Sequence, residues 1–297
     1  MRPDETKRRL WFGQPPRKVL TAACSHLALA VLGLLFVAPF VWLLSTSFKT
    51  EDQIFQRPPT QVLSLLHYLV PPRPTVANYE QGLTFVPFAR YLLNTLIICA
   101  MSVTGTLLSC SLVAYGLSRI QWRGREALFY LLLGTMMLPY QVVMVPLFVV
   151  FARIGWVDTW LPLWVPSFLG NALFIFLLRQ FFLTIPRELT DAARIDGASD
   201  LQIYSRIMLP LAKPALAVVA LLSFLGAWNE YLMPLIYISD DSKYTLSLGL
   251  AQFISQYGSY WGWLMAASTI MTVPIMVLFF FTQRTFIQGI SLTGIKG

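Results

Sequence analysis

The stretch TDAARIDGASDLQIYSRIMLP, residues 190–210, lies between two apolar runs that are each long enough to cross a bilayer. It carries four charged side chains in its first eleven residues, at Asp191, Arg194, Asp196 and Asp200. Charged side chains are costly inside hydrocarbon. The stretch is therefore expected to lie at a face of the membrane. Its ordered polar pattern suggests a function beyond that of a simple connection between two spans.

The composition excludes a water-soluble globular domain. Of the 297 residues, 56% are hydrophobic and only 12% are charged, whereas soluble domains have roughly 25% charged residues. The three cysteines, Cys24, Cys99 and Cys110, fall inside apolar runs and have no CxxC spacing. The two histidines, His26 and His67, are isolated in the sequence. Neither a disulfide framework nor a metal site is predicted.

Six apolar stretches predict six membrane-spanning helices, because a span needs about 20 mainly apolar residues in a helix that satisfies its own backbone groups. The predicted spans cover residues 20–47, 91–118, 127–151, 161–183, 214–238 and 262–283. The first span is too long for the apolar part of a signal peptide, and no cleavage pattern follows it. We expect an all-α membrane protein with an N-terminal segment, residues 1–19, and a single transmembrane domain, residues 20–297.

The distribution of Lys and Arg predicts the orientation. Sixteen of the 22 basic residues fall in the N-terminal segment, the 119–126 loop, the 179–213 segment and the C-terminal tail. The positive-inside rule places these segments, and both termini, in the cytoplasm. The net charge of +8 mostly reflects this topology, so nucleic-acid binding is not expected.

The 190–210 stretch is predicted to form two short helices. Pro186 suits a first helical turn, and Glu188 favours the positive end of the helix dipole. Ala192 and Ala193 belong to a small apolar face at helical spacing. Gly197 can supply the left-handed turn that closes the first helix and lets the chain reverse direction.

A second helix is expected directly after this turn, because Ser199 and Gln202 have the spacing of a capping box. Pro210 and Pro214 are expected to end it. Isolated helices this short are marginally stable, so the bundle, the lipid surface or a partner must hold them. Small residues surrounded by acids do not suit a membrane surface, where apolar and basic faces are usual. The pattern favours a protein partner.

The residues DAARIDGAS followed by IMLP resemble the cytoplasmic "EAA" signature of ABC importer permeases. Asp191 stands where Glu is more usual. The chain is similar over nearly its whole length to the carbohydrate-uptake branch of these permeases, in particular the maltose-type subunit. The stretches that carry this resemblance include SFKTEDQIF, NYEQGL, MLPYQVVMVPLFVVFARIGWVDTWL and AWNEYLMPLI. The resemblance implies the type I ABC importer permease fold, with both termini in the cytoplasm of a bacterial or archaeal cell (inner) membrane.

In that family the loop corresponding to residues 186–213, called here the coupling loop, docks on a cytoplasmic ATPase subunit. The residues that match coupling positions are Glu188, Asp191, Ala192, Ala193, Asp196, Gly197, Ala198, Ile207, Leu209 and Pro210. The resemblance implies a second homologous permease subunit, two ATPase subunits, an extracytoplasmic solute-binding protein and membrane lipid as partners. The sequence has no G-x-x-x-x-G-K-[ST] phosphate loop. The chain is therefore expected to be a transport subunit without a cofactor, and not an enzyme, with ATP-Mg on the partner ATPase.

Asn229 and Glu230 are the candidate residues of the substrate path. Glu230 is the only formal charge well inside a predicted span, and such a charge is usually functional or paired. Two interpretations stay open: a hydrogen bond with Asn229 that is purely structural, or a place in the lining of the translocation path.

Other classes of function stay open as well. An ion-coupled carrier normally needs more intramembrane acids or bases than this one. A membrane enzyme would need clustered His, Asp or Glu at a membrane face, and the sequence has no such cluster. An ABC importer for a polyol, glycerol phosphate or a peptide is the nearest alternative, because only the branch resemblance favours a sugar.

Overall fold

The computed structural model describes residues 16–56, 69–255 and 258–294, and their side chains at 20–56, 69–254 and 260–283. Most of the predicted N-terminal segment, residues 1–15, lies outside these ranges. Contacts divide the described residues into two compact units. Unit 1 extends to Tyr79 and includes Trp261–Thr269, and unit 2 contains Glu80–Tyr260 and the residues from Ile270 onward.

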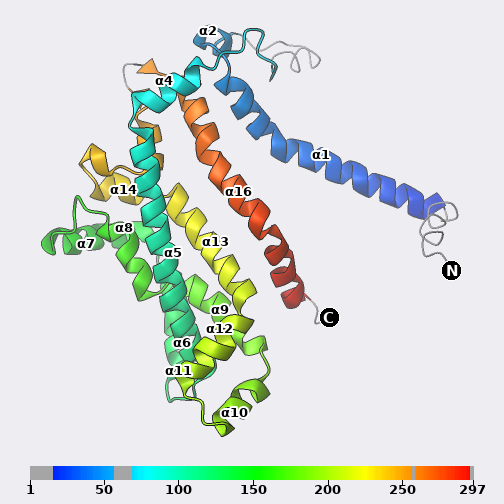
Figure 1. The fold of residues 1–297 in the computed structure, drawn as a ribbon, viewed down its shortest axis with the longest axis vertical. Coiled ribbons are helices and arrows are strands. Elements are labelled where there is room, and N and C mark those ends of the chain that lie inside the picture. Colours follow the sequence, from blue (N-terminus) through cyan, green and yellow to red (C-terminus); the bar gives the residue numbers. More distant parts are fainter. Residues whose placement is uncertain (1–15, 57–68, 256–257, 295–297) are drawn as a thin grey trace. The chain divides into compact units, whose positions relative to one another are not determined.

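The described residues form an almost entirely helical fold, as predicted (Figure 1). The long helices are α1 (Pro16–Ser47), α5 (Phe88–Ser118), α6 (Arg125–Thr135), α7 (Tyr140–Arg153), α9 (Ala172–Thr184), α13 (Lys213–Asn229) and α16 (Trp261–Gly294). The short helices are α2 (Glu51–Ile54), α4 (Ala77–Phe85), α8 (Leu161–Trp164), η2 (Val165–Leu169), α10 (Arg187–Ile195), α11 (Asp200–Ile203), η3 (Tyr204–Met208), α12 (Leu209–Leu211), α14 (Leu232–Tyr237), η4 (Asp241–Lys243) and α15 (Leu246–Ala251). Two two-residue strands, β1 (Ile254–Ser255) and β2 (Gly258–Ser259), pair antiparallel.

Four helical segments of the described chain are long and apolar enough to cross a membrane, namely Leu20–Ser47, Phe88–Ser118, Leu161–Thr184 and Trp261–Gln283. Two bent helix pairs also pass this test, Arg125–Thr135 with Tyr140–Arg153 and Asp200–Leu211 with Lys213–Asn229. The described residues therefore hold four spans, or six if each bent pair crosses once. This is the multi-span, all-helical class that the apolar stretches predict.

The predicted 127–151 span differs from a straight helix, because α6 and α7 meet at an angle of 97°. The bend falls before Pro139, which caps α7 with φ −66° and ψ 140°. Proline lacks an N–H donor and disfavours helical conformation in the residue before it. The predicted 214–238 span is also interrupted, since α13 ends at Asn229 and α14 begins at Leu232.

In unit 1, Asn78 joins the end of α1 to α4. Its Nδ2 donates hydrogen bonds to the carbonyl oxygens of Ser47 (2.9 Å) and Lys49 (2.7 Å). The carboxylate of Glu51 accepts the backbone N–H of Gly262 at 3.3 Å. These contacts tie the end of α1 to α4, and α2 to the start of α16.

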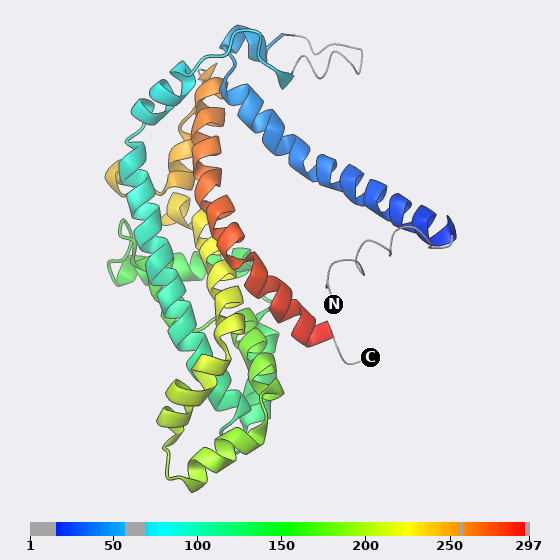
Figure 2. The same ribbon diagram turned by 45° about the vertical axis from the view of Figure 1, so that its right-hand side comes forward.

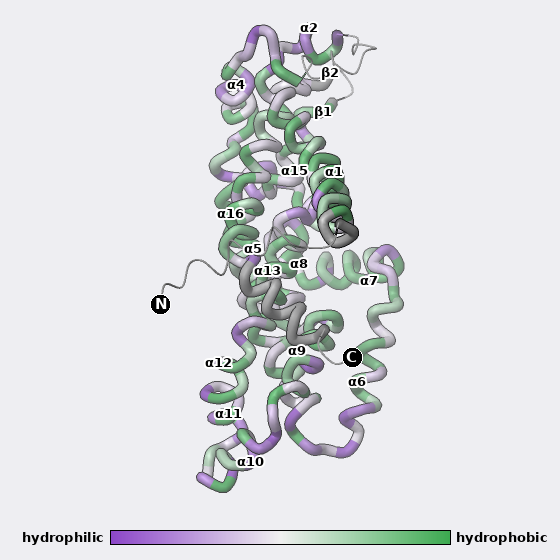
Figure 3. Tube along the Cα trace, turned by 90° about the vertical axis from the view of Figure 1, so that its right-hand side faces the viewer, coloured by the Kyte–Doolittle hydropathy of each residue, from purple (hydrophilic) through white to green (hydrophobic). Residues whose placement is uncertain are grey.

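In unit 2, α5 packs against α9, α13, η2 and α15 and forms the centre of the bundle. Gly105 permits the contact with η2, since a Cβ there would lie 2.4 Å from Cδ2 of Phe168. Hydrophilic residues occur around α10 (Figure 3). The coupling loop, with α10, α11 and α12, lies at one end of this unit (Figures 1 and 2).

Asp158, in the loop between α7 and α8, joins this loop to the segment after α14. Its carboxylate accepts the N–H groups of Ser239 (3.0 Å) and Asp240 (2.9 Å), and the ammonium group of Lys243 (2.9 Å). The Asp240 N–H, the Lys243 ammonium and the Ser239 N–H together lower the pKa of Asp158 from 3.8 to about 2. The indole of Trp160 donates to the Lys243 carbonyl at 2.9 Å.

Candidate functional site

The coupling loop contains a helical hairpin, α10 and α11 joined by a glycine turn. Gly197 has φ +81°, in the left-handed region that favours glycine. Its N–H donates to the Arg194 carbonyl (3.0 Å), and the N–H of Ala198 donates to the Ala193 carbonyl (2.9 Å). This pair of bonds is the Schellman closure of a helix. The predicted left-handed turn is confirmed.

The predicted capping box is also present. The Ser199 N–H donates to Oε1 of Gln202 (2.8 Å), and the Gln202 N–H donates to Oγ of Ser199 (3.3 Å). The second helix ends at Leu211, between Pro210 and Pro214, as expected. Before its end it passes through the π-helical turn η3, in which the Leu209 N–H donates to the Tyr204 carbonyl. A π turn accommodates a proline in a helix by shifting the hydrogen-bond register.

The base of the hairpin is anchored in the core. Ile203 and Met208 are fully buried, and Tyr204 is nearly so. The hydroxyls of Tyr204 and Ser111 share a hydrogen bond of 2.6 Å, and the Tyr204 ring lies 5.3 Å from the ring of Tyr115 on α5. The loop is therefore tied directly to the central helix of unit 2.

Arg119, just after α5, binds the end of α9. Its Nη2 donates to the carbonyl oxygens of Phe182 and Ile185, and the side chain is buried. Burial lowers the pKa of Arg119 from its ordinary value. A cation is favourable at a helix C-terminus, so this contact fixes α5 to the helix that leads into the coupling loop.

The predicted coupling residues divide into two groups. Glu188, Asp191, Ala192, Asp196, Gly197 and Pro210 are exposed, whereas Ala193, Ala198, Ile207 and Leu209 are partly buried. Ala193 and Ala198 pack against the core of this chain rather than facing outward. Sequence reasoning missed Ile195 and Leu201, whose side chains are 87% and 68% exposed at the hairpin tip. The sequence could have indicated them, since both are bulky apolar residues within a polar stretch.

The acids of the hairpin are partly neutralised by one arginine. Nη2 of Arg194 lies 3.1 Å from Oδ1 of Asp200, and its Nη1 lies 3.6 Å from Oδ1 of Asp191. Both pairs are solvent-exposed, so each stabilises the hairpin only weakly. The exposed hairpin surface therefore combines apolar tip residues with paired charges.

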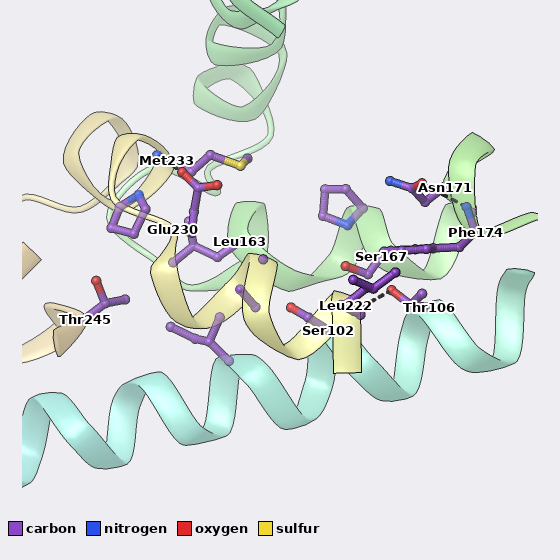
Figure 4. A pocket seen from close by; sticks show the side chains of 17 residues that line it. Ser102, Thr106, Leu163, Ser167, Asn171, Phe174, Leu222, Glu230, Met233 and Thr245 are labelled. Carbon is purple, nitrogen blue, oxygen red and sulfur yellow. Dashed lines mark hydrogen bonds between the residues drawn. The ribbon is translucent and has the colours of Figure 1, made fainter. Parts of the chain in front are cut away.

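Unit 2 also contains a cavity of about 420 Å³ between α5, α8, η2, α13 and α14. Its polar lining includes Ser102, Thr106, Ser167, Asn171, Ser223, Glu230 and Thr245. Figure 4 shows the hydroxyl groups of Ser102 and Thr106 rising from α5 toward the side chains on the other elements. Sequence reasoning identified Glu230 in this lining but not Ser102.

The two candidate substrate-path residues are placed differently. Glu230 lines the cavity, whereas Asn229 is not in its lining and donates from Nδ2 to the Leu225 carbonyl of its own helix (2.8 Å). Oε1 of Glu230 accepts the Met233 N–H at 3.1 Å. The Glu230 carbonyl accepts the Ser247 hydroxyl at 2.5 Å. The structural hydrogen bond of the Glu230 carboxylate is thus made to α14 and not to Asn229.

Residues 105–292 match the family of binding-protein-dependent transport system inner membrane components. The matched range contains the entire coupling loop and most of the cavity lining. The chain belongs to this family. It is a multi-pass membrane permease of an ABC importer, a transport subunit and not an enzyme.

Two relatives and one solved structure illustrate the similarity. The arabinooligosaccharides transport system permease protein of Halalkalibacterium halodurans is 33% identical over 273 residues, which cover 90% of this chain and 94% of the relative. The trehalose/maltose transport system permease protein of Thermococcus litoralis is 33% identical, with the same two coverages. A chain of a bacterial ABC transporter involved in the import of the acidic polysaccharide alginate aligns with a TM-score of 0.78 at 24% identity, covering 91% of this permease and 98% of that chain. This structural likeness shows the fold.

Proposed function

We propose that this permease forms half of the translocation path of an ATP-driven importer for a sugar or oligosaccharide. The coupling loop, residues 186–213, docks on a separate cytoplasmic ATPase subunit. A second homologous permease, two ATPase subunits that hold ATP-Mg, and an extracytoplasmic solute-binding protein complete the complex. This chain binds no cofactor of its own.

The observation that carries the proposal is the contrast between the tip and the base of the hairpin. The tip exposes Ile195 and Leu201, while the base buries Ile203 and Met208 in the core. An exposed apolar tip on a rigid, anchored base suits a partner that pulls or pushes the loop. Because the base contacts α5 through Tyr204, a displacement of the loop reaches the bundle directly.

The energy for a transport cycle, in which the permease alternates between two conformations, must come from outside this chain. Moving a two-state equilibrium from 1:99 to 99:1 takes about 5.5 kcal/mol of differential binding. ATP bound by the ATPase subunits, together with docking of the loaded solute-binding protein, can contribute this amount. The contribution of ATP binding reaches the permease through the coupling loop.

The sugar assignment rests on the relatives, whose names specify arabinooligosaccharides and trehalose or maltose. The hydroxyl-bearing and amide side chains of the cavity supply hydrogen-bonding groups that suit a polyhydroxylated solute. A polyol, glycerol phosphate or a peptide is the alternative solute, and competition in an uptake assay distinguishes these from sugars.

A substitution at the hairpin tip tests the coupling proposal. Ile195→Asp replaces an apolar side chain whose burial in a partner contributes about 1.5–3 kcal/mol. We expect ATPase subunits to be lost from the purified complex and ATP-dependent sugar uptake into proteoliposomes to fall at least tenfold. Ile195→Leu keeps the apolar side chain, and Ser205→Asp adds the same charge at an exposed position of η3.

Both control variants are expected to retain the ATPase. Retention of the ATPase and of normal uptake by Ile195→Asp would remove the hairpin tip from the docking surface. Loss of the ATPase in Ser205→Asp alone would move the docking surface from the tip to η3.

A further inference from the structure

The cavity of unit 2 has the properties of a ligand site. Its volume of about 420 Å³ lies within the range of roughly 300–1,000 Å³ that is usual for small-molecule sites. Its walls come from four separate parts of the chain. It lies within one compact unit.

Ser102 leaves an unsatisfied polar group in this lining. Its side chain is 4% exposed, and its Oγ has no hydrogen-bond partner among the described residues. Burying a hydroxyl without a partner is unfavourable, and native structures rarely keep one without a reason. The nearby Thr106 hydroxyl already accepts a hydrogen bond from Ser223 at 3.2 Å. The Ser102 hydroxyl is therefore available to a bound group.

Glu230 gives the cavity its charge. One carboxylate oxygen, Oε1, accepts the Met233 N–H, and no described residue bonds to the other. The lining contains no Lys, Arg or His side chain to neutralise this acid. An ionised carboxylate only accepts hydrogen bonds, so it suits the hydroxyls of a solute. It repels a solute that is itself an anion.

Phe174 adds an aromatic ring to the same lining. An aromatic face offers apolar contact area to the C–H groups of a solute while nearby polar groups bind its hydroxyls. The lining therefore combines a hydrogen-bond acceptor, a free hydroxyl and an apolar ring.

We propose that this cavity is a subsite for an uncharged sugar, in which Glu230 and Ser102 bind sugar hydroxyls and Glu230 excludes acidic sugars. The proposal rests on the proposed function, because it requires that the permease transports sugars. Beyond the proposed function, it names the residues that bind the sugar and states that the transported sugar is uncharged. It also separates this permease from the importer of the acidic polysaccharide whose fold it shares.

The test is direct binding to the permease–ATPase complex in nanodiscs, without the solute-binding protein, whose own affinity would otherwise dominate. Equilibrium dialysis uses three radiolabelled probes: maltotriose, arabinotriose and the mannuronate trimer. We expect at least one neutral trimer to bind and the mannuronate trimer to bind at least tenfold more weakly.

Two substitutions then identify the residues. Ser102→Ala is expected to weaken binding of the neutral trimer roughly two- to tenfold, and Glu230→Gln at least tenfold, because hydrogen bonds to charged groups are stronger. Glu230→Gln is also expected to reduce the discrimination against the mannuronate trimer. Thr104→Ala, on the exposed side of α5, and Asp241→Asn, an exposed acid outside the cavity, are controls that leave binding unchanged. If Glu230→Gln does not assemble, Glu230→Asp and Ser102→Ala carry the comparison.

The possible failures are distinguishable. If the reconstituted complex with its solute-binding protein imports neutral sugars but the two cavity variants bind the trimers like the wild type, the subsite is wrong and the proposed function stands. Absence of trimer binding to the wild-type complex leads to the same conclusion. If the complex imports no sugar but imports another solute, the sugar assignment fails, and the subsite fails with it.

Discussion

Replacing Gly197 by valine tests whether the geometry of the turn is required for coupling. At φ +81° an L-residue is strained, and a non-glycine residue held there costs about 1–3 kcal/mol. Apart from the glycine itself and its two chain neighbours, no heavy atom lies within 4 Å of a Cβ built at this position. The penalty therefore comes from the backbone and not from a clash with neighbouring side chains.

This strain energy falls on the hairpin tip, where few other contacts stabilise the closed turn. The tip is exposed, and its closure depends on two backbone hydrogen bonds, from Gly197 to Arg194 and from Ala198 to Ala193. A penalty of about 1–3 kcal/mol lowers the population of the closed turn by roughly 5- to 150-fold if the tip has no spare stability. We expect Gly197→Val to lose ATP-dependent uptake and ATPase association while membrane insertion remains normal.

Gly197→Asn is the matched control, because asparagine tolerates the left-handed region better than other residues. It is expected to retain most of the uptake, with Gly197→Ala intermediate. The assays are initial rates of ATP-dependent uptake in proteoliposomes and the amount of ATPase that copurifies. Wild-type uptake by Gly197→Val would refute the requirement for the turn. Equal losses in the valine and asparagine variants would refute the backbone explanation.

Three further changes test other contacts by the thermal midpoint of the purified permease. Tyr204→Phe should lower its unfolding free energy by about 1 kcal/mol, and adding Ser111→Ala should cause no further loss if the shared bond is the cause. Gly105→Ala should lower the unfolding free energy by about 1–3 kcal/mol by overpacking against Phe168. A smaller residue at position 168 should restore part of this stability. An unchanged thermal midpoint would contradict the close approach of Gly105 to Phe168. The pKa of Asp158 is lowered from 3.8 to about 2, so its stabilising contribution is complete above about pH 4 and is lost as the pH falls toward 2. Asp158→Asn should remove this part of the pH dependence of the thermal midpoint. A pH profile identical to that of the wild type would exclude a contribution of Asp158.

The elements that local sequence determines could be predicted well. The glycine turn and the Ser199 capping box depend on residues within three or four positions of each other, and both are present. The apolar stretches likewise predicted a multi-span helical chain. The 97° bend before Pro139 was harder, because a proline within a span has two outcomes, a small kink or a break, and only tertiary packing decides between them.

The site depended more on contacts between distant parts of the chain. The periodicity of the first short helix gave Ala192 and Ala193 the same status, but packing against the core separates them and leaves Ile195 outermost. Glu230 drew attention by its charge alone. Ser102 carried no such signal, since a serine in an apolar helix usually bonds to its own backbone, and only the assembled cavity shows its hydroxyl without a partner.

Helix α5 joins the two places at which this permease is proposed to act. Ser111, at the coupling loop, and Ser102, in the cavity, lie on one unbroken helix of 31 residues. Their nine-residue separation corresponds to roughly 14 Å along the axis and to opposite sides of the helix. If the coupling loop turns α5 as a rigid helix, the Ser102 hydroxyl in the cavity turns with it. Under the proposed function, movement of the loop and rearrangement of the cavity would then be a single rotation of α5, without a flexible segment between the two sites.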